Sequence, residues 1–422
     1  MSTAPPPADA NQATAEPTRP VRARWVSGVT LVNVGVNTAI FATLNQLLPL
    51  QALAISGDAH KEEAVSVAGT VGVLVAMIVN PVVGAFSDRT TSRLGRRTPW
   101  IIGGTVFALV ALLVLGQAHS VVALCLGWAV AQAGLNAVMA AVTATVPDRV
   151  PVAQRGFVGG IVVTGITLGV LVGSGIGMVA AGSVGLGYTL AVAVLAVSIV
   201  PYLTKRDDPV LLRAEPFSWR EFLAGFWVSP RKHPDFAWAW LGRLLMLSAV
   251  QLVIVYLLFY LRDRLHHPDP TAGVFLLTAI YAVATLACAA LAGKVSDRVG
   301  RRPIVAASSV LIAVAALLMA CASVVGEGEL WLAVLAAAVL GVGNGAYLGV
   351  DFALLTQVLP SSAARGRDMG LINIAASLPQ IFALGLAWLA VTRLGGYTVL
   401  FVGAGVVGLL GAASVYRIKS VR

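Results

Sequence analysis

Two ionisable side chains lie inside long apolar runs of this sequence, where their chemistry would be unusual. Arg243 and Asp351 each fall about 10 Å from the same end of a run, at 1.5 Å per residue of helix. A lone charge in an apolar environment is costly, so we expect the two residues to pair. The pair would either be a permanent structural contact, or would open during a conformational change that is coupled to protonation of Asp351.

Amide and phenol side chains form stripes on several of the apolar runs. At about 100° per residue, a helix places Gln132 and Asn136 on one face, and Asn344 with Tyr347 on another. Such groups either hydrogen-bond neighbouring helices or face a pathway for a polar solute. We predict substrate or coupling contacts from Asn33, Asn37, Gln132, Asn136, Arg243, Gln251, Tyr256, Asn344, Tyr347, Asp351, Asn373 and Gln380.

Enzyme chemistry is not indicated. Three of the five histidines, His233, His266 and His267, fall in predicted loops, and no spaced set of His, Cys or carboxylate residues suggests a metal site or a nucleophile. The Gly-x-x-x-x-Gly-Lys-Ser/Thr pattern of an ATP-binding loop does not occur. We therefore expect no enzyme activity, no metal and no bound cofactor, with a proton or sodium as the coupling ion if transport is coupled.

One polar string occurs twice, each time where an apolar run ends. Gly-Ala-Phe-Ser-Asp-Arg at 84–89 returns as Gly-Lys-Val-Ser-Asp-Arg at 293–298, and each copy is followed by an Arg-Arg pair and a Pro. Glycine permits close helix approach, and each Asp can face the positive end of a neighbouring helix. The string predicts an ion-paired latch that opens in one conformation; the alternative is that its arginines only set topology.

These residues require a framework of membrane-spanning helices. Of the 422 residues, 58% are hydrophobic and 11% charged, and the mean hydropathy is +0.86, well above a soluble domain. A span needs roughly 20 apolar residues, and the runs predict an all-α membrane protein with twelve transmembrane helices in two pseudo-symmetric six-helix bundles. The predicted parts are a tail at 1–24, bundles at 25–203 and 237–416, a loop at 204–236 and a tail at 417–422.

The basic residues that give the net charge of +10 lie mainly in the predicted loops and tails. Most basic residues fall in segments on one side of the predicted spans, as the positive-inside rule requires for cytoplasmic segments. The outer loops are predicted to hold only four basic residues: Lys61, Arg262, Arg264 and Arg393. The charge is thus a topology signal that places both termini in the cytoplasm, and we expect no nucleic-acid partner. We expect a monomer in the lipid bilayer of the cytoplasmic membrane. The loop at 204–236 is either a passive tether or contains a short surface helix with an aromatic face.

The repeated string resembles the signature loop of the major facilitator superfamily, which follows the second and eighth helices. The resemblance implies the two-bundle fold, alternating access and a central cavity lined by helices one, four, seven and ten. The expected latch partners are the starts of the helices that open near Gly156 and Asp368. The family's gating latch then falls on Asp88, Arg89, Arg97, Asp297, Arg298 and Arg302.

The longer pattern from Ser87 to Pro99 is similar to that of glycoside-pentoside-hexuronide symporters and plant sucrose carriers, as is Asn373–Gln380. The acidic residues that those symporters use on helices two and four have no counterpart here. Helix four has Gln132 and Asn136 in their place.

The resemblance implies a secondary transporter of a small polar solute, with a sugar or glycoside as the expected substrate. The alternative is a proton-driven exporter of drugs or secondary metabolites. Glycines on the fifth helix resemble in part the antiporter glycine motif of the superfamily: Gly160, Gly169, Gly173, Gly175 and Gly177. A non-transporting receptor with this fold is a third hypothesis, but it would be favoured by an added soluble domain, which the sequence does not show.

Overall fold

The computed structural model describes residues 17, 20–180, 182–204, 218–219, 234–325, 330–357 and 365–418. Within these ranges the side chains of 152–153, 156, 290, 293–294, 297 and 351–377 are not described. The predicted site residues Asp297, Asp351 and Asn373 are therefore outside the described side chains. So is most of the predicted loop at 204–236.

All regular structure in the described part of the chain is helical. The first half contains α1 (Ala23–Ala42), the π-helical turn η1 (Thr43–Leu47), α2 (Leu48–Asp88), α3 (Thr98–Leu115), α4 (Val121–Arg149), α5 (Val152–Val179) and α6 (Val184–Leu203). The second half contains α8 (Pro234–Ile254), α9 (Leu257–Asp263), α10 (Pro270–Val299), α11 (Arg301–Val325), α12 (Leu330–Gln357), α13 (Arg365–Arg393) and α14 (Tyr397–Val415).

Local sequence explains where several helices begin. The side chains of Ser120, Ser183 and Asp269 each accept a hydrogen bond from the main chain three residues later, which caps α4, α6 and α10. Proline occupies the first turn of α3 and α10, where its missing N–H costs nothing. These caps fix the register of the spans.

The run from Ala23 to Asp88 is 66 residues long, which as a straight helix would extend about 100 Å, some three times the thickness of a bilayer core. Gly57 interrupts it, with φ 68° and ψ −178°. Such backbone angles are essentially restricted to glycine. Gly57 therefore divides the run into two legs, and it directs Asp58 and the residues after it away from α1.

Ten helical segments in the described ranges are long and apolar enough to cross a membrane, with Ala23–Asp88 counted as one of them. A shorter apolar helix covers Leu378–Arg393. Large apolar side chains such as Val106, Val110 and Val114 are exposed at four-residue spacing along α3. An outward apolar stripe of this kind suits contact with lipid. The chain is a multi-pass membrane protein, as the sequence predicts.

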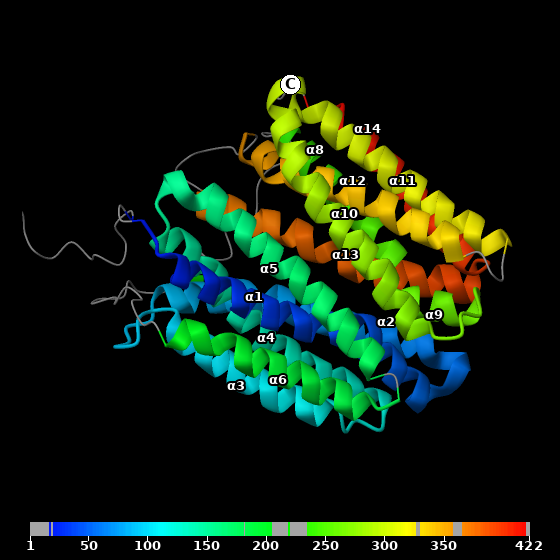
Figure 1. Cartoon of the computed structure of the whole chain (residues 1–422), viewed down its shortest axis with the longest axis horizontal. Helices are drawn as coiled ribbons and strands as arrows, with labels where there is room; N and C mark the ends of the chain where they lie inside the picture. Colours follow the sequence, from blue (N-terminus) through cyan, green and yellow to red (C-terminus); the bar gives the residue numbers. More distant parts are fainter. Residues whose placement is uncertain are drawn as a thin grey trace, which may run out of the picture.

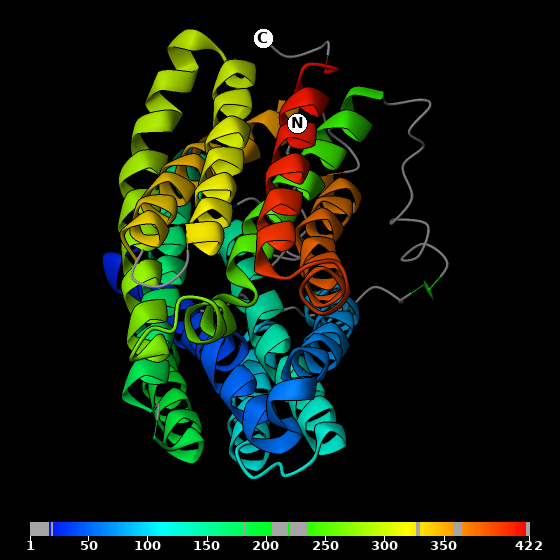
Figure 2. The same ribbon diagram turned by 90° about the vertical axis from the view of Figure 1, so that its right-hand side faces the viewer.

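The helices form two groups: in Figure 1, α8 and α10–α14 lie mostly above α1–α6, and α9 lies at the right-hand end near α2. In the first group α5 packs on α1 and α4 packs on α2 and α3; in the second, α12 packs on α10 and α11, and α14 packs on α8 and α11. The groups meet where α2 contacts α13 and where α5 contacts α10. Figure 2, turned by 90°, keeps the blue helices at the bottom and the orange and red helices at the top.

Candidate functional site

The predicted polar stripe on α1 is buried. Asn33 and Asn37 are 2% and 5% exposed, and their amide groups donate to the carbonyls of Val29 and Asn33 at 2.9 and 2.8 Å. These bonds hold each side chain along its own helix. They use the amide donors, and among the described residues nothing donates to the two side-chain oxygens.

A second pair lies on α4, which packs against α1. The Asn136 amide donates to the main-chain and side-chain oxygens of Gln132, at 2.9 and 2.8 Å, and both residues are buried. Gln132 also lies beside Gly72 of α2, next to the indole of Trp128. Neutral amides at this depth can bind a polar solute through hydrogen bonds without the cost of a buried charge.

The second half places its predicted residues on three helices. Asn344 of α12 donates to the Tyr281 hydroxyl of α10 at 2.7 Å, and Tyr347 is buried on α12 within electrostatic range of Arg243 on α8. Gln251 and Gln380 are half-buried. The predicted contact of Arg243 with Asp351 involves a side chain outside the described set, so it stays a prediction.

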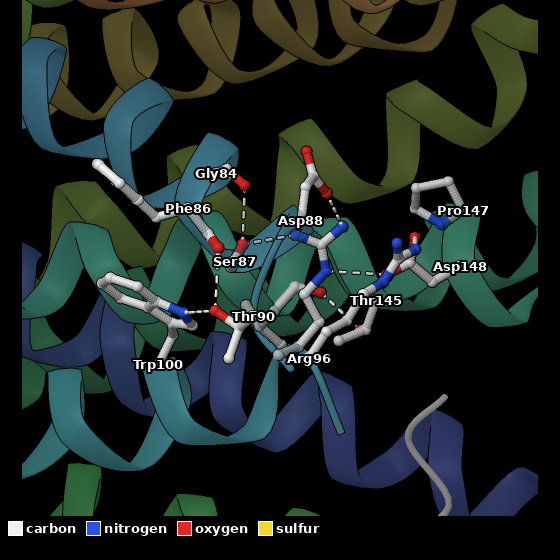
Figure 3. Close-up of polar contacts among 12 residues, drawn as sticks. Gly84, Phe86, Ser87, Asp88, Thr90, Arg96, Trp100, Thr145, Pro147 and Asp148 are labelled. Atoms are coloured by element: carbon white, nitrogen blue, oxygen red, sulfur yellow. Dashed lines mark hydrogen bonds and ion pairs between the residues drawn. The ribbon is translucent and has the colours of Figure 1, made fainter. Parts of the chain in front are cut away.

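Arg97 belongs to the Arg-Arg pair that follows the first copy of the repeated string, and Figure 3 labels its partners Ser87, Asp88 and Asp148. Its guanidinium donates to the carboxylate of Asp88, to Ser87 Oγ at 2.5 Å, and to Asp148 Oδ2 at 2.9 Å. Arg96 also binds Asp148, with one contact of 3.1 Å. We call Ser87, Asp88, Arg96, Arg97 and Asp148 the α2–α4 clamp.

The clamp lies within one bundle. Asp148, in the last turn of α4, accepts hydrogen bonds from both arginines and belongs to the same bundle as Asp88. The positions named from the sequence, near Gly156 and Asp368, lie where side-chain contacts are not described, so the expected latch partners stay a prediction. Arg89 donates to the Ala85 carbonyl of its own helix at 3.0 Å. Sequence reasoning missed Asp148 because its partnership depends on where α4 ends.

The second copy makes a different contact. Arg302 donates to the main-chain oxygen of Tyr416 at 2.8 Å, which ties α11 to the end of α14. Arg298 is exposed, and Asp297 is outside the described side chains. The two copies are alike in sequence, and the contact described for Arg302 reaches the end of α14. A gating role for either copy stays a prediction.

A third polar group contains one predicted site residue, Tyr256, together with charged residues that were not predicted. Lys61, which the charge pattern assigns to an outer loop, lies in helix α2 and is only 4% exposed. Its Nζ is 2.6 Å from Asp263 at the end of α9 and 3.1 Å from Asp58. Arg262 binds Asp58 at 2.6 Å, and Tyr256 donates to the main-chain oxygen of Glu62 at 2.8 Å. We call this group the α2–α9 junction; it joins the two bundles.

The glycines of α5 have a packing role. A Cβ at Gly169 or Gly173 would come within 2.7–2.8 Å of the main chain of α1, and one at Gly177 would overlap the side chain of Gln46. Gly165 adds a fourth contact, with Thr30. Gly175 faces Phe275 of α10, and a Cβ at Gly160 would have no atom within 4 Å. Close helix approach explains Gly165, Gly169, Gly173 and Gly177 without an antiporter function.

A family model described as "Major Facilitator Superfamily" matches residues 26–287 and 269–421, nearly the whole chain. The chain belongs to the Major Facilitator Superfamily. This confirms the resemblance seen in the repeated string. The chain is a membrane transporter and not an enzyme.

Solved structures of two transporters are similar to this chain in fold, at low sequence identity. A peptide transporter POT in complex with sulfate superposes with a TM-score of 0.73 at 14% identity, with 96% of each chain covered. The nucleoside transporter NupG gives 0.74 at 12% identity, with 94% of this chain and 100% of that chain covered.

Short stretches are similar to plant sucrose transporters. The match to sucrose transport protein SUC4 of Arabidopsis thaliana is 41% identical over 58 residues, which is 14% of this chain and 10% of that protein. The match to sucrose transport protein SUT1 of Oryza sativa subsp. japonica is 47% identical over 45 residues, 11% of this chain and 8% of that protein. The chain thus matches about a tenth of the length of these relatives.

Proposed function

We propose that this protein is a secondary active transporter that moves a small polar solute across the cytoplasmic membrane by alternating access. The substrate would be a sugar or glycoside, and a proton or sodium ion would couple its movement. Twelve spans, with Ala23–Asp88 contributing two of them and both termini in the cytoplasm, complete the proposal. The protein would act as a monomer.

The observation that carries the proposal is the placement of the contacts between the bundles. A group of hydrogen bonds and ion pairs joins α1–α6 to α8–α14 at residues 58–66: Lys61 to Asp263, Asp58 to Arg262, Glu62 to Tyr256, and Ser66 to the Leu384 carbonyl at 3.1 Å. All lie in the first turns after Gly57. Bundles that are tied at one end suit a rocking motion about a central site.

The polar character of the substrate rests on the amides of α1 and α4. Asn33, Asn37, Gln132 and Asn136 are all buried in helices that are otherwise apolar. Hydrogen-bonding amides suit a hydroxylated solute better than an oily one. The short matches to sucrose transporters favour a sugar in particular. The alternative, an exporter of drugs, loses support from the α5 glycines, since Gly169 and Gly173 pack against α1 and Gly177 packs against Gln46.

Uptake into proteoliposomes tests the proposal. Labelled sugars and glycosides are offered with and without imposed proton and sodium gradients. We expect uphill accumulation of one class, reduced at least tenfold in Gln132→Ala and Asn136→Ala, and unchanged in Thr189→Val, an exposed polar residue on α6. Proton-driven extrusion of lipophilic cations with no sugar uptake would contradict it.

A further inference from the structure

The α2–α9 junction contains a buried carboxylate with little to stabilise its charge. Glu62 is 8% exposed, and its side chain is 10% exposed. Its nearest charged partner is Lys61, whose Nζ is 3.9 Å from Oε1. The hydrogen bond from Tyr256 goes to the main-chain oxygen of Glu62 and not to the carboxylate. Apart from its own main-chain N–H, no described residue donates a hydrogen bond to this carboxylate.

Lys61 is already engaged by other acids. Its Nζ contacts Asp263 at 2.6 Å and Asp58 at 3.1 Å, and it also lies over the ring of Phe259 at 5.2 Å. Arg262 is occupied by Asp58 at 2.6 Å. Three carboxylates thus meet two basic side chains at the junction, and the carboxylate that is both buried and poorly paired belongs to Glu62.

The remaining groups near Glu62 do not supply positive charge. Asp58 and Asp263 lie within electrostatic range of it, as do the hydroxyls of Tyr256 and Tyr397. Tyr397 donates to Asp263 at 3.3 Å. On the neighbouring turn, His60 pairs with Glu63 at 3.4 Å, and both are exposed. An ionised carboxylate that is buried with so few donors is unfavourable, and neutralisation by a proton removes that cost.

We propose that Glu62 carries a proton while the α2–α9 junction is closed and releases it when the junction opens. The inference rests on the proposed alternation between the bundles. A carboxylate oxygen takes the proton from the water at that end of the protein and returns it there; no other bond changes. Because closure takes up a proton, low pH favours the closed junction and rising pH favours opening.

Spin-label distances across the junction test this. Cysteines are placed at the exposed positions Ala59 and Pro268, after replacement of Cys125, Cys288 and Cys321 by alanine. Distances between the two labels are measured in nanodiscs from pH 5 to pH 8.5. We expect a short distance at low pH and a growing long-distance population as the pH rises.

The variants separate the possible explanations. Glu62→Gln, which mimics the protonated acid, should keep the short distance at all pH values. Glu63→Gln changes the adjacent exposed acid and should keep the pH dependence of the parent, as should His60→Gln. If Glu62→Gln does not fold, Glu62→Asp should move the midpoint of the transition without removing it.

Two results would overturn the inference. Glu62→Gln with the same pH dependence as the parent would show that another group takes the proton. If the distance in the parent does not depend on pH but Lys61→Met still lengthens it, the proposed role of the proton is wrong and the proposed alternation stands. If neither pH nor Lys61→Met nor Asp263→Asn changes the distance, the proposed alternation fails as well.

Discussion

Lys61 of α2 and Asp263 of α9, about 200 residues apart in the sequence, form an ion pair of 2.6 Å that joins the two bundles. The lysine side chain is 5% exposed and the aspartate side chain 26% exposed. Removal of one partner from such a pair leaves the other as a poorly solvated charge. The pair therefore has a direct effect on whether the bundles stay together at this end.

Lys61→Met should favour an open junction. Loss of the base leaves Asp263 without its buried cation, at a cost of about 1–3 kcal/mol to the closed form once the partial exposure of Asp263 is considered. A cysteine at Ser66, which is 8% exposed, should then react faster with a maleimide that does not cross membranes. His60→Ala, which removes an exposed pair, should leave the rate unchanged. Equal rates in both variants would contradict the role of Lys61.

Arg97→Lys should destabilise the α2–α4 clamp. A lysine cannot donate at once to Asp88, Ser87 and Asp148 in the planar geometry of the guanidinium, so we expect a loss of about 1–3 kcal/mol of unfolding free energy. Thermal unfolding in detergent measures the change. Arg93→Lys, an exposed arginine of the same loop, is the control and should keep the parental Tm.

Gly173→Val should disturb the packing of α5 on α1. A Cβ there comes within 2.8 Å of the Ala42 nitrogen and the Thr38 oxygen, both main-chain atoms that cannot move aside cheaply. Overpacking of this kind costs about 1–3 kcal/mol. Gly160→Val is the matched variant on the same helix, and no neighbouring atom lies within 4 Å of its Cβ position. Equal melting temperatures for the two variants would show that the close approach is not required.

The Asp58–Arg262 pair should be insensitive to physiological pH. The hydrogen bond from Arg262, followed by that from Lys61, lowers the pKa of Asp58 from 3.8 to about 2. Because the pKa is depressed, the contribution of the pair is fully present above about pH 4 and is lost as the pH falls towards 2. An NMR titration of the Asp58 carboxylate should therefore show no change of ionisation between pH 5 and pH 8. A change of its chemical shift with a midpoint in that range would contradict this.

Much of the fold follows from the sequence because its signals are local. Apolar runs predict the spans, and Ser120 and Asp269 indicate the starts of α4 and α10. The repeated string identifies the superfamily. The amides of α1 and α4 are buried as their angular positions suggest. The structure differs on the seventh predicted helix, which is divided into α8 and α9 near Tyr256.

The contacts between distant segments could not be predicted in this way. The charged segment after Gly57 predicts a loop that includes Lys61, whose burial depends on α9, about 200 residues further along. Asp148 has an ordinary position at a helix end, and the packing of α4 on α2 and α3 brings it to Arg97. In both cases tertiary packing determines the partner of a charged residue, so no spacing in the sequence indicates the pair.

The glycines of α5 have a mechanical consequence. With main-chain atoms in contact at Gly165, Gly169 and Gly173, α1 and α5 cannot slide past each other by less than a full helical turn without steric overlap. The two helices should therefore move as one stiff beam. The π-helical turn Thr43–Leu47 is held to the same beam, because the Gln46 amide donates to the carbonyl and hydroxyl of Ser174 on α5 at 2.8 and 3.1 Å. A rotation of α5 should therefore be passed on to the start of α2.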